Sequence, residues 1–160
     1  LAEPDRCAKV TVRDAIGFLP AVGESGDSLH DFTSSKRSAR IQALIEAIPK
    51  NGGSRHSLPE ELKLDCHKKT SGFNDVYGRM QWDDVAPTIT SGCTNPSKGR
   101  FLHPDYDRAI TLREAAILQG FPIDYKFNIL HGKEAIGLML GNALPPTFIC
   151  AHSKRMAQEL

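Results

Sequence analysis

The sequence predicts an α+β fold in which a small, irregular β-rich lobe is flanked by helices. Helical patterns with capping residues occur near both ends of the chain, and short β-prone runs lie between them. The regular alternation of strand and helix that marks a complete doubly wound sheet is missing. We therefore expect a helical and loop segment at 1–72, a β-rich core at 73–107 and a helical segment at 108–160.

The first segment contains two helical patterns. Thr11 and Asp14 have the spacing of a capping box and precede apolar residues, and Pro20 ends this helix. A second helix is predicted from about 35 to 47, because apolar residues recur there with helical spacing: Ile41, Leu44, Ile45 and Ile48.

The middle segment contains four β-prone runs, punctuated by Asp83-Asp84 and Gly92. They are Val76–Tyr77, Met80–Trp82, Thr88–Thr90 and Phe101–His103. Runs of two or three residues predict short, irregular strands.

Helices return in the last segment. Thr111 and Glu114 form a full capping box, and Gly120 ends the helix that follows. A short apolar helix is expected over 133–140, stopped by Gly141. Pro145-Pro146 then begins the final helix.

Composition places the chain among ordinary globular proteins. Its 160 residues include 20 Lys+Arg and 19 Asp+Glu, so a net charge of +1 excludes a globally basic nucleic-acid coat but allows a local basic face. No apolar run approaches the ~20 residues of a membrane span, which predicts a soluble chain. The four cysteines form no C-x-x-C pair, so we expect no metal site and free thiols in a reducing cytoplasm.

Several segments, in this order, carry a family resemblance: TVRDAIGFLP at 11–20, GFNDVYGRMQWDDVAPTIT at 72–90, NPSKGRFLHP at 95–104, RAITLREAAILQGFP at 108–122 and GNALPP at 141–146. Together they resemble the C-terminal part of bacterial cytosine-5 DNA methyltransferases. The resemblance implies that 73–107 is the core of a target-recognition region and that 108–160 holds the last two motifs of the family. It also implies that the C-terminal helices pack on an S-adenosylmethionine-dependent α/β domain that this sequence lacks.

The chemical groups of that family are absent. The family's mechanism uses the thiolate of a Pro-Cys dipeptide to attack C6 of a flipped-out cytosine, and the methyl group then passes from S-adenosylmethionine to C5. This sequence has no Pro-Cys dipeptide, no Glu-Asn pair and no glycine-rich donor loop. We therefore assign no catalytic residue and expect the isolated chain to be inactive.

The first methionine is Met80, which favours a piece cut from a longer enzyme. The alternative is a non-catalytic DNA-recognition subunit of a split methyltransferase. A standalone DNA-binding module and an unrelated α+β domain are weaker readings. The expected partners are double-stranded DNA, the missing catalytic domain and, through the exposed apolar face of the last helices, a second copy of this chain.

Five residues are candidates for DNA binding. Arg79 matches the region where the family places a base-contacting arginine, and arginine is shaped for a bidentate bond to guanine. A surface ion pair with a nearby aspartate is its alternative. Thr88 and Thr90 match the family's threonine pair, whose hydroxyls suit phosphate contacts, although β-branched residues also simply favour strands. Lys98 and Arg100 lie in a basic Gly/Asn/Pro/Ser loop that would attract phosphates or remain solvated.

The resemblance implies that Asn142, Ala143 and Leu144 bind the methyl donor, because they match the family's stretch beside S-adenosylmethionine. The alternative is an ordinary helix stop at this turn. Glu114 also belongs to a family motif, but its place in the capping box favours a structural role.

Overall fold

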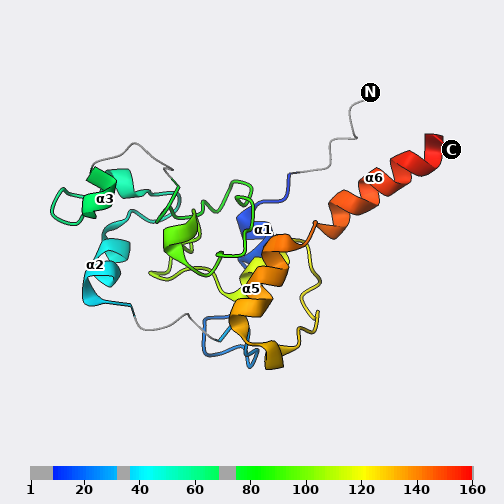
Figure 1. Ribbon diagram of the computed structural model, residues 1–160, viewed down its shortest axis with the longest axis horizontal. Helices are drawn as coiled ribbons and strands as arrows, with labels where there is room; N and C mark the ends of the chain where they lie inside the picture. The colour runs from blue at the N-terminus through cyan, green and yellow to red at the C-terminus, as the bar shows by residue number, and fades with distance from the viewer. Residues whose placement is uncertain (1–8, 32–36, 69–74, 160) are drawn as a thin grey trace.

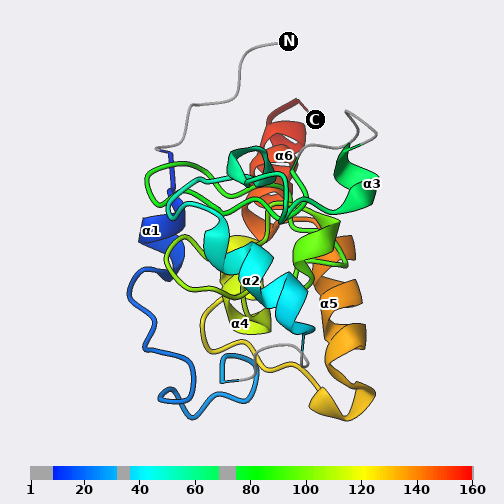
Figure 2. The same ribbon diagram turned by 90° about the vertical axis from the view of Figure 1, so that its left-hand side faces the viewer.

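The computed structural model describes residues 9–31, 37–68 and 75–159. Six α-helices are found in these ranges: α1 (Val12–Ile16), α2 (Ala39–Ala47), α3 (Asp65–Lys68), α4 (Leu112–Leu118), α5 (Lys133–Asn142) and α6 (Pro146–Glu159) (Figure 1). Three 3₁₀ turns accompany them: η1 (Arg55–Ser57), η2 (Pro96–Lys98) and η3 (Ile129–His131). Figure 2 shows α4 between α1 and α5, and both of these helices contact it.

The predicted helix starts are confirmed where capping residues define them. Both capping boxes form: Thr11 with Asp14 opens α1, and Thr111 with Glu114 opens α4. Helix α2 begins after Ser38, whose side chain accepts a hydrogen bond from the Ile41 N–H. The sequence predicted a beginning near residue 35, which lies outside the described residues. The predicted end of the helix over 133–140 was wrong, because α5 continues through Gly141 to Asn142.

The β-prone runs form isolated bridges in the described part of the chain. Leu102 pairs in parallel with Arg79 and antiparallel with Ala109. The Met80 N–H donates to the Leu102 carbonyl at 2.9 Å, and the Ile110 N–H to that of Phe101 at 2.8 Å. Pro104 then lacks the N–H that would extend the pairing. The expected strands at Val76–Tyr77 and Thr88–Thr90 do not pair.

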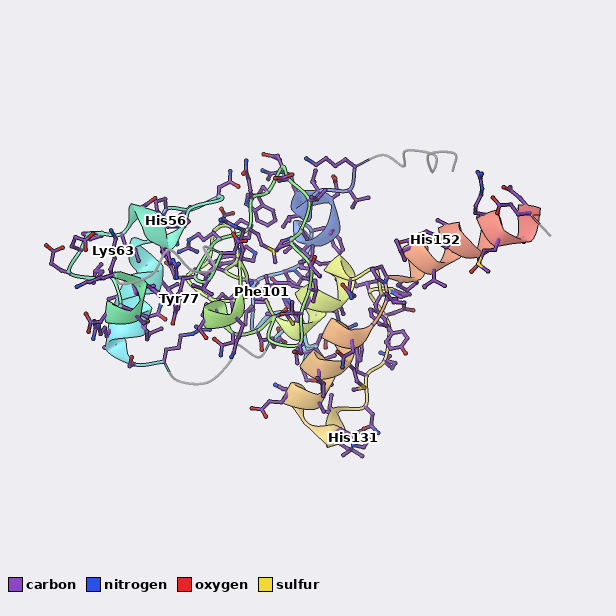
Figure 3. All side chains as sticks on the ribbon, turned by 45° about the horizontal axis from the view of Figure 1, so that its top comes forward. His56, Lys63, Tyr77, Phe101, His131 and His152 are labelled. Atoms are coloured by element: carbon purple, nitrogen blue, oxygen red, sulfur yellow. The ribbon has the colours of Figure 1, made fainter. Side chains whose placement is uncertain are left out.

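Two hydrophobic clusters lie on either side of these bridged segments. The larger joins α1, α4 and α5 around Met80, Ile89 and Phe101. The smaller joins α2 with Leu58, Tyr77 and Leu102. Phe101 and Leu102 are neighbours in an extended run, so their side chains project to opposite clusters. Figure 3 places Phe101 near the middle of the molecule and Tyr77 toward the end that carries His56 and Lys63.

Helix α6 stands apart from both clusters. None of its residues is buried, and it extends away from the body toward the C-terminus (Figure 1).

By length and composition alone the stretch Lys133–Glu159 could cross a membrane, whereas the sequence suggested no such segment. This is weak support for a span, because core helices pass the same test. Ile136 and Leu140 of α5 lie fully buried in the larger cluster.

Candidate nucleic-acid interface and donor turn

The segment Thr88–Ser91 presents two of the predicted DNA-binding residues to solvent. Thr88 and Thr90 are exposed, while Ile89 between them is buried in the larger cluster. Cys93 is also buried, and its N–H donates to the Thr90 carbonyl at 3.0 Å. The segment is therefore anchored through Ile89 and Cys93, which leaves both threonine hydroxyls on the outer face.

Helix α5 supports this segment through two glycines. Gly137 and Gly141 are four residues apart and so lie on one face of the helix. A Cβ atom on Gly137 would lie 3.3 Å from the Ser91 carbonyl oxygen. A Cβ atom on Gly141 would lie 2.5 Å from Ser91 Cα, and closer still to the Ser91 nitrogen and the Thr90 carbonyl carbon. The predicted DNA-binding segment thus rests directly on the helix that ends at Asn142.

The predicted donor-binding residues form a fixed turn between α5 and α6. Asn142 is the last residue of α5, and Ala143 caps it in extended conformation. The side-chain amide of Gln119 is buried and donates to the carbonyls of Leu140 and Ala143. Asn142 and Leu144 are exposed, and Ala143 is half-buried. The turn therefore has a rigid backbone and an open outer side.

A cleft of about 700 Å³ opens beside the end of the Thr88–Ser91 segment. Arg37, Lys98 and Lys133 reach it from three separate parts of the chain, and Glu134 is the one acid among its described lining residues. Hydroxyl and amide groups complete its polar lining: Tyr77, Ser91, Thr94, Asn95 and Ser97. Cations and hydrogen-bond donors in this arrangement suit a phosphodiester backbone.

Two of the cleft's cations were not predicted from the sequence. Burial lowers the pKa of the Arg37 guanidinium and that of the Lys133 ammonium. Lys133 opens α5, where the helix dipole disfavours a positive charge. A lysine at the first position of a predicted helix could therefore have pointed to a functional charge. The place of Arg37 in the cleft depends on tertiary structure alone.

Tyr77 holds a strained backbone at the wall of this cleft. Its φ angle of 59° lies in the left-handed region, which bulky residues rarely adopt. The Tyr77 N–H donates to the Pro96 carbonyl at 2.7 Å, which ties the η2 turn to the body. Lys98, at the end of η2, is exposed and passes over Gly92. The predicted DNA-binding lysine is thus mounted on an anchored turn.

Arg79 does not occupy a DNA-contacting position, and our prediction for it is wrong. Its side chain has no exposed surface. The guanidinium donates to the carbonyls of Ile45, Ile48, His103 and Tyr106, at 2.7 to 3.1 Å, and to the Asp107 carboxylate. These five bonds use all five N–H groups that an arginine has. Arg79 therefore joins the α2 end of the molecule to the 103–107 loop.

Arg100 is also used within the chain. Its Nε donates to Asp75 at 3.1 Å, and its Nη1 donates to the carbonyls of Gly52 and Arg79 at 3.2 and 3.0 Å. Its side chain retains 28% exposure. Arg100 therefore fastens separate parts of the chain to one another, and its DNA contact stays a prediction.

A buried ionic group connects α4 to the bridged segments. Arg108 makes a bidentate pair with Glu114 at 2.7 and 2.8 Å. Burial alone would raise the pKa of Glu114, but its hydrogen bond and charge interaction with Arg108 lower it overall. His103 Nδ1 accepts the N–H groups of Asp105 and Tyr106, and burial lowers the pKa of His103 to about 4. Glu114 thus has the structural role that its capping box predicted.

Comparison with known proteins identifies the class. The profile of the C-5 cytosine-specific DNA methylase family matches residues 20–158, and the chain belongs to this family. It is 44% identical over 144 residues to the type II methylase M.HgiDII of Herpetosiphon aurantiacus, covering 84% of this chain and 40% of that protein. It is 38% identical over 121 residues to the type II methyltransferase M1.BsuMI of Bacillus subtilis, covering 75% and 27% respectively.

A plant protein is similar as well. DNA (cytosine-5)-methyltransferase 3 of Arabidopsis thaliana is 34% identical over 182 residues, covering 94% of this chain and 13% of that protein. The chain thus spans well under half the length of these relatives.

Proposed function

We propose that this chain forms the target-recognition and C-terminal part of a DNA cytosine-5-methyltransferase. The observation that carries the proposal is the family match over residues 20–158 in a chain that spans 40% of M.HgiDII. The geometry adds support, because helix α5 contacts the segment that carries the exposed threonines, lines the basic cleft and ends at the Asn142 turn. The complete enzyme would transfer a methyl group from S-adenosylmethionine to C5 of a flipped cytosine.

On the DNA side, Thr88 and Thr90 contact the duplex while the cleft holds a stretch of backbone. Lys98 and Lys133 neutralise phosphates there, and Arg37 adds a third positive charge. These contacts set the orientation of the duplex but read no sequence directly. The target sequence is therefore read by base contacts from the neighbouring loops.

On the donor side, Asn142, Ala143 and Leu144 form one wall of the S-adenosylmethionine pocket. The Gln119 hydrogen bonds hold the backbone of this wall in place without the rest of the pocket. The remaining walls, the nucleophilic cysteine and the acidic residue belong to the catalytic part of the enzyme. Helix α6, whose residues are all unburied, packs against that α/β part and completes an α+β arrangement.

The test is methyl transfer to plasmid DNA, mapped by bisulfite sequencing. This chain alone, the catalytic part alone and the two together are each incubated with S-adenosylmethionine and the plasmid. Cytosine-5 methylation at one recurring sequence is expected only when both parts are present. Methylation by this chain alone, or none by the complete protein while its fold and donor binding are intact, would overturn the proposal.

A further inference from the structure

We infer that Gly141 is a positioning residue that couples DNA binding to donor binding. The inference rests on the proposed function and adds a mechanical link between its two sites. In this link, the Thr88–Ser91 segment and the Asn142–Leu144 turn are held in one rigid register by contact between the backbone of Ser91 and helix α5.

The first ground is the closeness of the contact at Gly141. A Cβ atom there would lie 2.5 Å from Ser91 Cα, and real Cβ contacts essentially never fall below 3.0 Å. The obstructing atoms are backbone atoms of Thr90 and Ser91, so no side-chain rotation relieves the overlap. Any side chain at 141 must therefore push the segment and the helix apart.

The second ground is that both partners are anchored. Ile89 and Cys93 fasten the DNA-side segment into the same cluster that contains Ile136 and Leu140 of α5. Gln119 fastens the end of α5 by donating to the Leu140 and Ala143 carbonyls. A shift of one partner is thus transmitted to the other, because neither can yield locally in a close-packed interior.

The third ground is the composition of α5 itself. Glycine inside a helix is unfavourable relative to alanine, yet α5 has glycine at both positions that face Ser91. Helix formation gives no reason for glycine at 141, whereas close approach of the Ser91 backbone does. Asn142, the first predicted donor-binding residue, follows directly in sequence.

The experiment measures coupling in the complete enzyme. The dissociation constant of S-adenosylhomocysteine, a probe of the donor site, is determined by calorimetry without DNA, with a duplex carrying the mapped target and with a scrambled duplex. The ratio of the constants without and with target DNA is the coupling factor, and it is independent of how much protein is folded. For the wild type we expect a factor of about 5 or more.

The Gly141→Ala variant is expected to lower the coupling factor to below about 2. Gly137→Ala is the matched variant, because it makes the same substitution in the same helix but brings its Cβ only to 3.3 Å from the Ser91 oxygen. The coupling factor of Gly137→Ala should fall between those of the wild type and Gly141→Ala. Gly137→Val enlarges the overlap at this milder position, so the inference is measurable even if Gly141→Ala does not fold.

The outcomes separate the inference from the proposed function. Failure of the wild type to bind target DNA or S-adenosylhomocysteine would overturn the proposed function and, with it, the inference. Binding of both with a coupling factor near 1 would overturn the inference alone. So would an undiminished factor in Gly141→Ala or, where that variant does not fold, in Gly137→Val. A factor that falls from wild type through Gly137→Ala to Gly141→Ala, or to Gly137→Val in its place, supports it.

Discussion

Arg79 illustrates how completely a buried arginine can be used inside a protein. Each of its five N–H groups has an acceptor, four of which are backbone carbonyls from two separate parts of the chain. Arginine meets this demand because its donors form a rigid planar fork, which a lysine ammonium cannot reproduce. This residue therefore holds two separate parts of the chain together.

Arg79→Ala is expected to lower the free energy of unfolding of this chain by about 3–5 kcal/mol, because it leaves the buried carbonyls of Ile48 and His103 without their donor and removes one of the two cations that pair with Asp107. Urea unfolding followed by circular dichroism measures the change. Arg79→Lys should recover only part of the loss. Arg155→Ala, which removes an exposed ion pair with Glu159 on α6, is the control and should cost less than about 1 kcal/mol. A similar small loss in Arg79→Ala would contradict the assignment.

His103 makes the stability of the chain depend on pH. Its neutral form accepts two backbone N–H groups at Nδ1, and burial lowers its pKa from 6.5 to about 4. The unfolded chain therefore binds the proton more readily than the folded chain, so stability falls as pH drops from about 6.5 to 4. The linked free energy is about 3 kcal/mol.

The check is the urea midpoint of the wild type between pH 4 and pH 7, compared with His103→Asn, whose Oδ1 takes the position of Nδ1 and accepts the same N–H groups. The variant should lose most of the slope above pH 5, where the carboxylates contribute little. His131→Gln changes an exposed histidine and should keep the wild-type slope. A wild-type midpoint that stays level from pH 5 to pH 7 would show that His103 is not held neutral.

At the scale of elements, the basic cleft joins three segments that have no sequence pattern in common. The start of α5, the η2 turn and the residue before the α2 cap each supply one cation. Separate elements make the cleft a product of packing, so its charge is fixed in space by the fold. A phosphate backbone bound there would release counterions for each charge neutralised.

The double variant Lys98→Ala, Lys133→Ala in the complete enzyme should reduce the slope of log K against log salt concentration by roughly 2, about 0.9 for each lost phosphate contact. Titrations of a labelled duplex at several salt concentrations give this slope. The loss should be the same for target and scrambled duplexes, because phosphate contacts carry no sequence information. Lys63→Ala, outside the cleft, should leave the slope unchanged. An unaltered slope in the double variant would exclude the cleft as a backbone site.

At the scale of the whole molecule, the C-terminal end exposes a large apolar surface. Leu144, Phe148, Ile149 and Met156 are 43% to 67% exposed, and α6 buries none of its residues. Surface of this kind marks an interaction site. In the proposed enzyme it is covered by the catalytic part, and in its absence a second copy of the chain is the available partner.

We therefore expect the isolated chain to self-associate with rising concentration, as measured by size-exclusion chromatography with light scattering. The double variant Phe148→Asp, Ile149→Asp should be monomeric at the same concentrations. Cys150→Ser tests whether a disulfide through this exposed thiol is responsible, and it should associate as the wild type does. A monomeric wild type at all concentrations would contradict the expectation.

The sequence by itself determined the local structure and the family. Both capping boxes were predictable, because a threonine and an acidic residue three positions later satisfy each other's backbone groups without help from the rest of the chain. The family motifs are likewise contiguous runs of residues. The exposure of Thr88, Thr90 and Lys98 agrees with their predicted placement, although their contacts with DNA stay predictions.

Only the tertiary structure decided how each charged side chain is used. The sequence suggested a DNA contact or a surface ion pair for Arg79, but its guanidinium donates to the carbonyls of Ile45 and Ile48, 34 and 31 residues away. The tertiary structure also decided the role of Gly141. The sequence predicted that it ends a helix, whereas it lies within α5 and against the backbone of Ser91. The physical reason is range: capping depends on neighbours within one helical turn, whereas burial and close approach depend on segments that meet only when the chain has folded.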